Sequence, residues 1–253
     1  MNSCIKWVGG KRLLRKQILA EFPEDYTRYV EVFGGAAWLL FARERDNRVE
    51  VYNDRNHNLV NLFRCIKYHG EALQEELKWC LVSREFFEDA LHNYQNPDLT
   101  DIQRAARFFV LIKCSFGAKL QDFSGARVSL VNTVRNLEQF QERLKNTVIE
   151  QMDFEKLLIL YDKKDTFFYL DPPYFQAEKY YRDSFSEKDH LRLKEVLISL
   201  KGKFLLTYND CPFIRTLYQQ FSIVPMVRQN NMASCSTMGD YLEIMIKNYY
   251  MIE

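Results

Sequence analysis

Residues 167–177 read FFYLDPPYFQA, and this stretch predicts how the chain is built around it. A run of strand-forming residues leads directly into Asp171, Pro172, Pro173 and Tyr174. Asp-Pro is common turn chemistry, and a proline also pushes the residue before it towards extended backbone. A turn, however, needs neither a second proline nor flanking aromatic rings. The stretch therefore predicts a buried strand that ends in a carboxylate held on a stiff backbone, with an aromatic face beside it.

Short apolar runs predict the other strands of the fold. They lie at 29–33, 49–53, 203–209 and 241–250, and a further strand is expected at 147–151. Helical periodicity separates them, as at Leu193, Val196, Leu197 and Leu200, which follow a helix cap at Ser186. Strands that alternate with helices predict the α/β class, with a mostly parallel sheet covered on both faces.

Residues 69–146 interrupt this alternation. The spacing of Ile102, Ala105, Ala106 and Phe109 predicts a helix there, and a polar loop reading SFGAKLQDFSGARVS follows at 115–129. We interpret 69–146 as a mainly helical insertion. The remaining residues, 1–68 plus 147–253, would form one discontinuous domain.

Composition predicts a soluble globular protein, since 47% of the 253 residues are hydrophobic and 27% are charged. No apolar run approaches the roughly 20 residues that a membrane-spanning helix needs, and the N-terminus lacks the apolar core of a secretory signal. The six cysteines form no C-x-x-C pair, and the four histidines form no ligand pair. We therefore expect reduced thiols, a cytoplasmic protein and no metal site.

The net charge of +1 is unevenly distributed. Residues 1–20 carry +5 and residues 100–148 carry +4, so the rest of the chain carries about −8. Two basic segments on an acidic body fit a local contact with a polyanion such as nucleic acid. Two solvated helical faces would give the same pattern, so charge alone leaves both interpretations open.

Chemically useful residues follow the predicted strands. Gly34 and Gly35 come after strand 29–33, where glycines allow the backbone to approach a ligand and a helix N-terminus offers N–H donors. Asp54 follows strand 49–53 and is placed to accept hydrogen bonds from ribose hydroxyls, although Asp also caps helices. In open α/β sheets ligands bind at the carboxyl ends of the strands. The pattern therefore predicts a cofactor that contains a nucleoside.

S-adenosylmethionine suits these motifs better than other nucleoside cofactors. GGKR at 9–12 does not fit a phosphate-binding loop, and the glycines at 34–35 do not complete a dinucleotide fingerprint. S-adenosylmethionine has no phosphate and needs an acid for its ribose, an apolar slot for adenine and polar groups for its amino-acid end.

The DPPY stretch suits an exocyclic amine as the second substrate. Such an amine is a poor nucleophile because its lone pair is delocalised into the ring. The Asp171 carboxylate and the Pro172 carbonyl can accept its two N–H groups and favour a localised lone pair, with Pro172 and Pro173 keeping both acceptors rigid. Tyr174 would stack on a base extruded from the duplex.

KWVGGK at 6–11, EVFGGAA at 31–37, YND at 52–54 and DPPY at 171–174 together resemble the Dam family of DNA adenine-N6 methyltransferases. The resemblance covers most of the chain, including a target-recognition insertion. It implies a Rossmann-like fold, S-adenosylmethionine as cofactor, and methylation of adenine N6 on a flipped-out base of double-stranded DNA. The compact insertion resembles the phage or prophage branch, which implies a bacterial or phage-encoded protein.

The resemblance also implies roles for individual residues. Lys6 would lie near the target base, Asp54 would hold the ribose, Asp171 would border both the cofactor and base pockets, and TYND at 207–210 would line the base pocket. The remaining cofactor contacts would come from three motifs, namely Trp7, Gly9, Gly10 and Lys11, then Phe33, Gly34 and Gly35, and finally Asp153 and Phe154.

In the insertion, the loop at 115–129 is predicted to read the target through Lys119, Gln121 and Arg127. Arg127 could instead cap the fold of the insertion itself. One departure from the family is Ala37, which stands where a second spaced glycine is usual.

Two other functions fit much of the same sequence. One is methylation of another planar amine, such as an RNA base, cytosine N4 or a protein amide, although such enzymes more often carry Asn at the position of Asp171. The other is a DNA-binding relative without catalytic activity, which the intact DPPY argues against.

Overall fold

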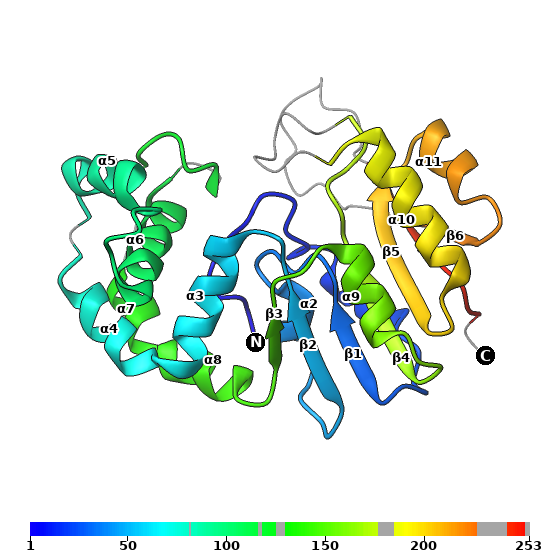
Figure 1. Ribbon diagram of the computed structural model, residues 1–253, viewed down its shortest axis with the longest axis horizontal. Helices are drawn as coiled ribbons and strands as arrows, with labels where there is room; N and C mark the ends of the chain where they lie inside the picture. Colours follow the sequence, from blue (N-terminus) through cyan, green and yellow to red (C-terminus); the bar gives the residue numbers. More distant parts are fainter. Residues whose placement is uncertain (81, 116–117, 125–129, 177–184, 227–241, 251–253) are drawn as a thin grey trace.

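A computed structural model describes residues 1–80, 82–115, 118–124, 130–176, 185–226 and 242–250. These residues form a seven-stranded sheet with helices on both faces (Figure 1). The strands are β1 (Arg28–Glu31), β2 (Val49–Asn53), β3 (Val148–Glu150), β4 (Thr166–Leu170), β5 (Lys203–Asn209), β6 (Ser222–Met226) and β7 (Glu243–Lys247). Their order across the sheet is β3-β2-β1-β4-β5-β7-β6.

The first five strands of this order are parallel, and β7 runs antiparallel between β5 and β6. The predicted α/β class with a mostly parallel sheet is therefore confirmed. From β1 the chain moves outward to β2 and β3, then returns to the other side of β1 as β4. The junction of β1 and β4 is the point at which the strand order reverses, which is where α/β sheets bind ligands.

The expected strand at 241–250 is shorter, since β7 covers Glu243–Lys247, and residue 241 lies outside the described residues. β6 was not predicted from the sequence. Its run SIVPM contains Pro225, which lacks an N–H group and weakens the strand signal. β6 lies at an edge of the sheet, where proline is tolerated.

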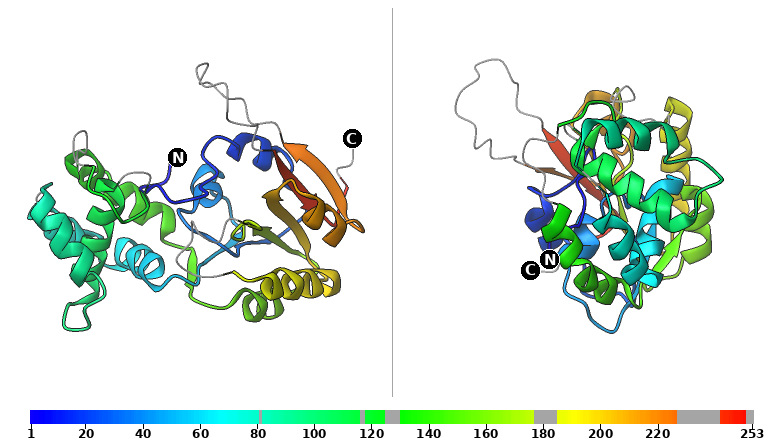
Figure 2. Two further views of the ribbon diagram at one scale, coloured as in Figure 1. Left: turned by 90° about the horizontal axis from the view of Figure 1, so that it is seen from above. Right: turned by 90° about the vertical axis from the view of Figure 1, so that its left-hand side faces the viewer.

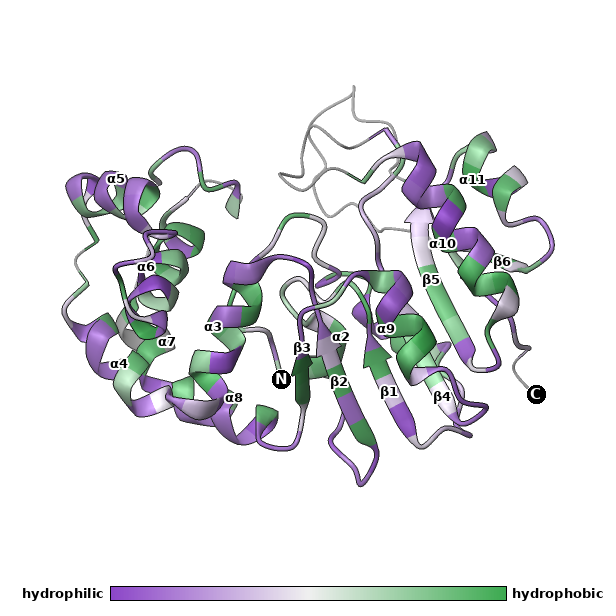
Figure 3. Ribbon diagram, in the orientation of Figure 1, coloured by the Kyte–Doolittle hydropathy of each residue, from purple (hydrophilic) through white to green (hydrophobic). Residues whose placement is uncertain are grey.

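Side chains alternate between two apolar layers along the central strands. Val30 and Phe168 pack on one face, in the layer completed by α9 (Phe154–Tyr161), α10 (Glu187–Ser199) and α11 (Pro212–Leu217). Tyr29 and Phe167 point to the other face, which is covered by α1 (Arg15–Ala20), α2 (Trp38–Ala42) and α3 (His57–Tyr68). Figure 2 shows α1 and the α9–α10 pair on opposite sides of the sheet. In Figure 3 hydrophobic and hydrophilic residues alternate along α3, α9 and α10, as expected for helices with one buried side.

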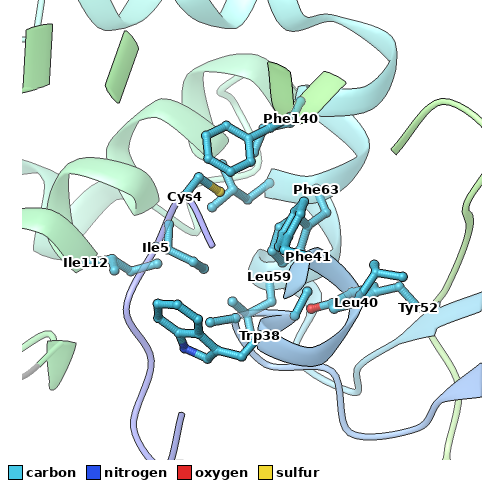
Figure 4. Packing of buried hydrophobic residues seen from close by; sticks show 14 of the residues in the cluster. Cys4, Ile5, Trp38, Leu40, Phe41, Tyr52, Leu59, Phe63, Ile112 and Phe140 are labelled. Atoms are coloured by element: carbon cyan, nitrogen blue, oxygen red, sulfur yellow. The ribbon is translucent and has the colours of Figure 1, made fainter. Parts of the chain in front are cut away.

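The described part of the insertion is helical apart from a single bridge between Ser115 and Phe123. Its helices are α4 (Gly70–Lys78), α5 (Arg84–Asn93), α6 (Asp101–Cys114), α7 (Leu130–Arg135) and α8 (Leu137–Leu144). Their apolar sides join the core that covers the sheet, and the N-terminal segment is part of this junction. Figure 4 shows Cys4 and Ile5 between Ile112 of α6, Phe140 of α8 and Trp38 of α2. The boundaries at 69 and 146 remain a prediction.

A buried cluster of charged side chains links the insertion to the sheet. Glu50 of β2 accepts hydrogen bonds from Arg43 at 2.8 Å and from Arg143 of α8 at 2.5 and 2.8 Å. Thr147 also donates to this carboxylate. Removal of one partner of such a buried pair costs about 3–5 kcal/mol. The cluster therefore fixes where α8 lies relative to β2.

Candidate active site

The carboxyl ends of β1, β2 and β4 meet the N-terminal segment around a cavity of about 230 Å³. The cavity brings together most of the residues that the sequence predicts for the cofactor and the chemistry. These are Trp7, Gly9, Gly10, Lys11, Phe33, Gly34, Gly35, Asp54, Asp171 and Pro173. Pro172 is buried at the end of β4, and Tyr174 is half-buried beside it.

Asp171 is held in the cavity wall through one of its two carboxylate oxygens. Its Oδ1 atom accepts a hydrogen bond from Thr207 of β5 at 2.7 Å and lies 2.7 Å from Lys11 Nζ. Among the described residues, no hydrogen bond to Oδ2 occurs. Burial raises the pKa of Asp171, and the ammonium group of Lys11 opposes that rise. One oxygen is thus fixed by the protein, while the other can accept a hydrogen bond from a substrate.

Lys11 is buried more deeply than a binding lysine usually is, with a side chain only 5% exposed. Besides Asp171, its ammonium donates to the Gly9 carbonyl at 3.0 Å and lies 4.8 Å from the centre of the Tyr174 ring. The resemblance assigned Lys11 to the cofactor. In the structure it lines the cavity and is also the counter-ion of Asp171.

The glycine turn after β1 differs in detail from the expectation. The N–H of Gly34 donates to Asn53 O and that of Gly35 to Asp54 Oδ2, both at 2.7 Å, so neither is a free donor for a ligand. A Cβ atom on Gly34 would come within 2.2 Å of the Tyr52 ring. Gly35 has φ +49°, a conformation that side chains rarely adopt. These glycines are required by packing and backbone conformation as well as by their place in the cavity wall.

Asp54 is held between two loops of the site. Oδ2 accepts the Gly35 N–H, and Oδ1 accepts the Asn56 N–H at 2.7 Å. The residue that caps α3 is Asn56, whose side chain accepts from the N–H groups of Asn58 and Leu59. The alternative that Asp54 is the helix cap is therefore wrong. A carboxylate oxygen can accept a second hydrogen bond, so the fixed Asp54 retains acceptor capacity towards the cavity.

Asp153 and Phe154 line a smaller adjoining cavity together with Phe33 and Phe185. The rings of Phe33, Phe154 and Phe185 have centroids 5.7 to 5.8 Å apart. The sequence analysis did not identify Phe185, which lines both cavities and stands directly before the Ser186 cap of α10. The three rings pack against one another as one aromatic cluster, and Asp153 lines the same small cavity.

Arg192 of α10 contacts both Asp153 and Phe154, and the sequence analysis did not predict it either. It donates to Asp153 Oδ2 at 2.9 Å, and its guanidinium lies 4.4 Å from the centre of the Phe154 ring. The other Asp153 oxygen accepts the Glu155 N–H at 3.0 Å. Arg192 therefore holds both the Asp153 carboxylate and the Phe154 ring in place.

Two further carboxylates near Asp171 were not singled out, since Glu31 only opens the EVFGGAA stretch and Glu243 belongs to no recognisable motif. Glu31, at the end of β1, lines the cavity and accepts from Tyr29 Oη at 3.0 Å and from the Leu40 N–H at 2.8 Å. Burial raises the pKa of Glu31 to about 8. Glu243, at the start of β7, accepts the Tyr174 hydroxyl at 2.5 Å.

The predicted DNA contacts are placed less completely. Lys6 is exposed on the N-terminal segment, Lys119 is exposed and lines the cavity, and Gln121 is exposed next to it. Arg127 lies outside the described residues. The structure thus brings Lys119 to the cavity, and the DNA-binding roles of all four residues remain predictions.

The basic excess of residues 100–148 is partly internal. Arg143 belongs to the buried cluster on Glu50, and Arg104 donates to the Leu99 and Asn96 carbonyls and to Asp101. Arg143 is therefore buried away from any polyanion, and the Arg104 guanidinium already donates to three acceptors inside the protein. Within the described ranges, no cluster of three or more His, Cys, Asp or Glu residues could hold a metal ion, and no helix there could span a membrane.

Comparison with known proteins agrees with this geometry. A family model described as D12 class N6 adenine-specific DNA methyltransferase matches residues 7–232. The type II methyltransferase M.CviBI of Paramecium bursaria Chlorella virus NC1A is 26% identical over 232 residues, which cover 87% of this chain and 88% of that protein. The DNA adenine methylase of Haemophilus influenzae is 25% identical, with 85% and 82% covered. The modification methylase StsI of Streptococcus sanguinis is 25% identical over 72% of this chain and 30% of its own length.

Proposed function

Because the chain belongs to the D12 class of N6 adenine-specific DNA methyltransferases, we propose that it methylates adenine N6 in double-stranded DNA with S-adenosylmethionine as donor, in the cavity at the ends of β1 and β4. The observation that carries this proposal is the geometry of Asp171. Its carboxylate lies at the end of β4 in the wall of the cavity, where Lys11 and Thr207 hold Oδ1 and, within the described residues, no hydrogen bond engages Oδ2.

The residues of the cavity fit the parts of S-adenosylmethionine. Phe33 and Phe185 line the cavity, where their apolar rings would pack on the adenine ring, and the Asp54 carboxylate would accept hydrogen bonds from the ribose hydroxyls. Trp7, Gly9, Gly10 and Lys11 border the remaining volume and would enclose the amino-acid end. When bound, the cofactor supplies a methyl group on a positively charged sulfur, which an amine nitrogen can attack directly.

Asp171 and the Pro172 carbonyl would act on the target amine. Asp171 Oδ2 and the carbonyl accept the two N6–H groups, which localises the lone pair that attacks the methyl group. Lys11 and Thr207 hold Oδ1 and so set the orientation of the carboxylate. As the new N–C bond formed, the sulfur–methyl bond would break with its electron pair left on the sulfur, N6 would become positively charged and lose a proton, and Asp171 is the carboxylate placed to hold that proton.

The target base would have to leave the duplex, because an adenine amine inside a base pair cannot reach a buried carboxylate. Tyr174 is the aromatic residue of DPPY that would stack on the extruded base. Lys6 and the loop with Lys119, Gln121 and Arg127 would contact the DNA around it. We further propose that the enzyme acts on cytoplasmic DNA of a bacterial cell, encoded by the bacterium or by a phage.

The test is to incubate the protein with S-adenosylmethionine labelled in its methyl group and with DNA of mixed sequence, and then to digest the DNA to nucleosides. N6-methyladenine nucleoside is the expected product. Asp171→Ala should lose on the order of 100- to 1000-fold in rate while the thermal unfolding transition remains. Label in N4-methylcytosine, or only in RNA or protein substrates, would overturn the proposal. Binding of the cofactor without transfer to any DNA would instead indicate an inactive relative.

A further inference from the structure

Glu243 is a carboxylate that no motif of the chain identifies, although it lies beside the DPPY residues. It begins β7, the antiparallel strand between β5 and β6, and pairs there with Asn209 of β5 and Met226 of β6. Asn209 belongs to the same strand end as Thr207, which holds Asp171. The fold therefore carries Glu243 to the site from a segment about 70 residues after DPPY.

The Glu243 side chain is 12% exposed and contacts two groups of the site through one oxygen. Oε2 accepts the Tyr174 hydroxyl at 2.5 Å and lies 3.7 Å from Lys11 Nζ. The same ammonium group lies 2.7 Å from Asp171 Oδ1. Glu243 and Asp171 thus share one lysine, and Tyr174 contacts both Lys11 and Glu243.

We propose that Glu243 is a positioning residue for methyl transfer, which holds the Tyr174 ring in the orientation that stacks on the target base and keeps Lys11 beside Asp171. This inference rests on the proposed role of the DPPY residues. It extends that role to a residue on a different strand, which touches neither the base nor the cofactor in our proposal.

The physical reason lies in the freedom of a tyrosine side chain. Its ring turns about two bonds, so contact with Lys11 at one face does not by itself fix its orientation. A hydrogen bond to a charged acceptor is short and strong, and this one anchors the far end of the ring. A ring that is already held in place loses no further rotational freedom when the base stacks on it. The entropic cost of ordering the ring therefore does not add to the barrier for methyl transfer.

A tyrosine–glutamate pair could also be only a structural contact, and the chain contains a matched pair of that kind. Tyr161, at the end of α9, donates to Glu150 of β3 at 2.7 Å, and neither residue lines the cavity. Glu150→Gln and Tyr161→Phe therefore remove the same chemistry away from the site. They are the controls for Glu243→Gln and Tyr174→Phe.

The experiment measures methylation by the two single variants, the double variant Tyr174→Phe/Glu243→Gln and the control variants. We expect Glu243→Gln to lower kcat about 10- to 100-fold, with KM for S-adenosylmethionine changed less than about 3-fold. Glu243→Asp, which keeps the charge, should recover part of the loss. In the Tyr174→Phe background the Glu243→Gln change should have a much smaller effect, because the hydrogen bond is already absent.

A second measurement reports base positioning without turnover. A duplex with fluorescent 2-aminopurine at the target position brightens when that base leaves the stack, and Glu243→Gln should reduce the brightening. The control pair should leave both kcat and fluorescence unchanged. If Glu243→Gln unfolds, Tyr174→Phe probes the same hydrogen bond from its other end.

Unchanged kcat in both Glu243→Gln and Tyr174→Phe would overturn the inference, as would losses that multiply independently in the double variant. These results are distinguishable from failure of the proposed function. If the wild type methylates DNA and Asp171→Ala does not, the site is correct, and only the role of Glu243 is rejected by such data.

Discussion

Replacement of Lys11 by methionine tests the electrostatics of the site, because it removes the ammonium group and keeps an unbranched chain of similar length. In the wild type, Nζ lies 2.7 Å from Asp171 Oδ1, and the two side chains are 5% and 16% exposed. With an effective dielectric constant of about 20, the attraction at this distance is about 6 kcal/mol. Desolvation of the two charges offsets part of that attraction, so loss of one partner costs about 3–5 kcal/mol.

The variant should suffer mainly through the protonation state of Asp171. Burial raises the pKa of this carboxyl group and Lys11 opposes the rise, while Glu243 raises it further. The other titratable groups that interact with Asp171 are Glu31, Tyr169, Tyr174 and Tyr208. Without Lys11 the pKa of Asp171 rises further, so the carboxyl group stays protonated to a higher pH than in the wild type. A protonated Asp171 is a weaker acceptor, and the rate at pH 7 should fall on the order of 100- to 1000-fold.

The assay is single-turnover methylation at saturating S-adenosylmethionine between pH 6 and 10. The acid limb of the pH–rate profile should move to higher pH in Lys11→Met, so that part of the lost rate returns near pH 9. Lys188→Met, on the exposed side of α10, is the control for a lost lysine. An acid limb that stays in place or moves to lower pH would refute the reasoning, because Asp171 would then not depend on Lys11 for its charge.

Three further predictions concern the rest of the cavity. In steady-state kinetics, Asp54→Ala should raise KM for S-adenosylmethionine more than KM for DNA, because a ribose contact contributes equally to the ground and transition states. A larger rise in KM for DNA would reject the assignment of Asp54 to the ribose. Arg192→Ala should weaken the binding of S-adenosylhomocysteine about 10-fold, measured by calorimetry, without a change in DNA binding. The variant Lys188→Ala, at an exposed position, should bind S-adenosylhomocysteine as the wild type does. Equal affinity of the two variants for S-adenosylhomocysteine would exclude a support role for Arg192. Glu31 has a pKa raised to about 8, so its contribution to stability is present below the unfolded value near 4.5 and is lost as pH rises through 8. The free energy of unfolding of Glu31→Gln should therefore rise relative to that of the wild type between pH 5 and 9, by on the order of 4–5 kcal/mol. Chemical denaturation at a series of pH values measures this difference, and a difference that does not change with pH would contradict the prediction.

The sequence predicted the parts of this site that depend on strand ends. Asp54, Asp171 and the glycine pair follow apolar runs, and parallel strands deliver their carboxyl ends to one edge of the sheet. The helix after Ser186 was likewise predictable, since its capping box with Asp189 is written in the local sequence. These features need only local pattern and the topology of the α/β class.

The residues that sequence reasoning missed reach the site through pairing or packing between distant segments. Glu243 arrives because β7 inserts antiparallel next to β5, and no local signal marks that choice. Phe185 and Arg192 act through contacts with Phe154, which the spacing along the chain does not reveal. The positive charge of residues 100–148 overstated the charge that is available at the surface, because Arg143 is used inside the protein, where it links α8 to Glu50.

The cavity concentrates negative charge that the protein neutralises only in part. Asp171 and Glu243 share one ammonium group, that of Lys11, while Glu31 and Asp54 are further carboxyl groups at the cavity wall. Buried carboxylates without a full complement of partners are costly, and the raised pKa values of Glu31 and Asp171 express that cost. A ligand that brings a positive charge into this cavity relieves the cost, and a neutral ligand does not. In the proposed reaction, a methyl donor whose charge lies on sulfur before transfer, and passes to the target nitrogen during it, would place its charge beside these carboxylates at both stages. The same imbalance that weakens the empty site therefore favours the charged donor over its neutral product.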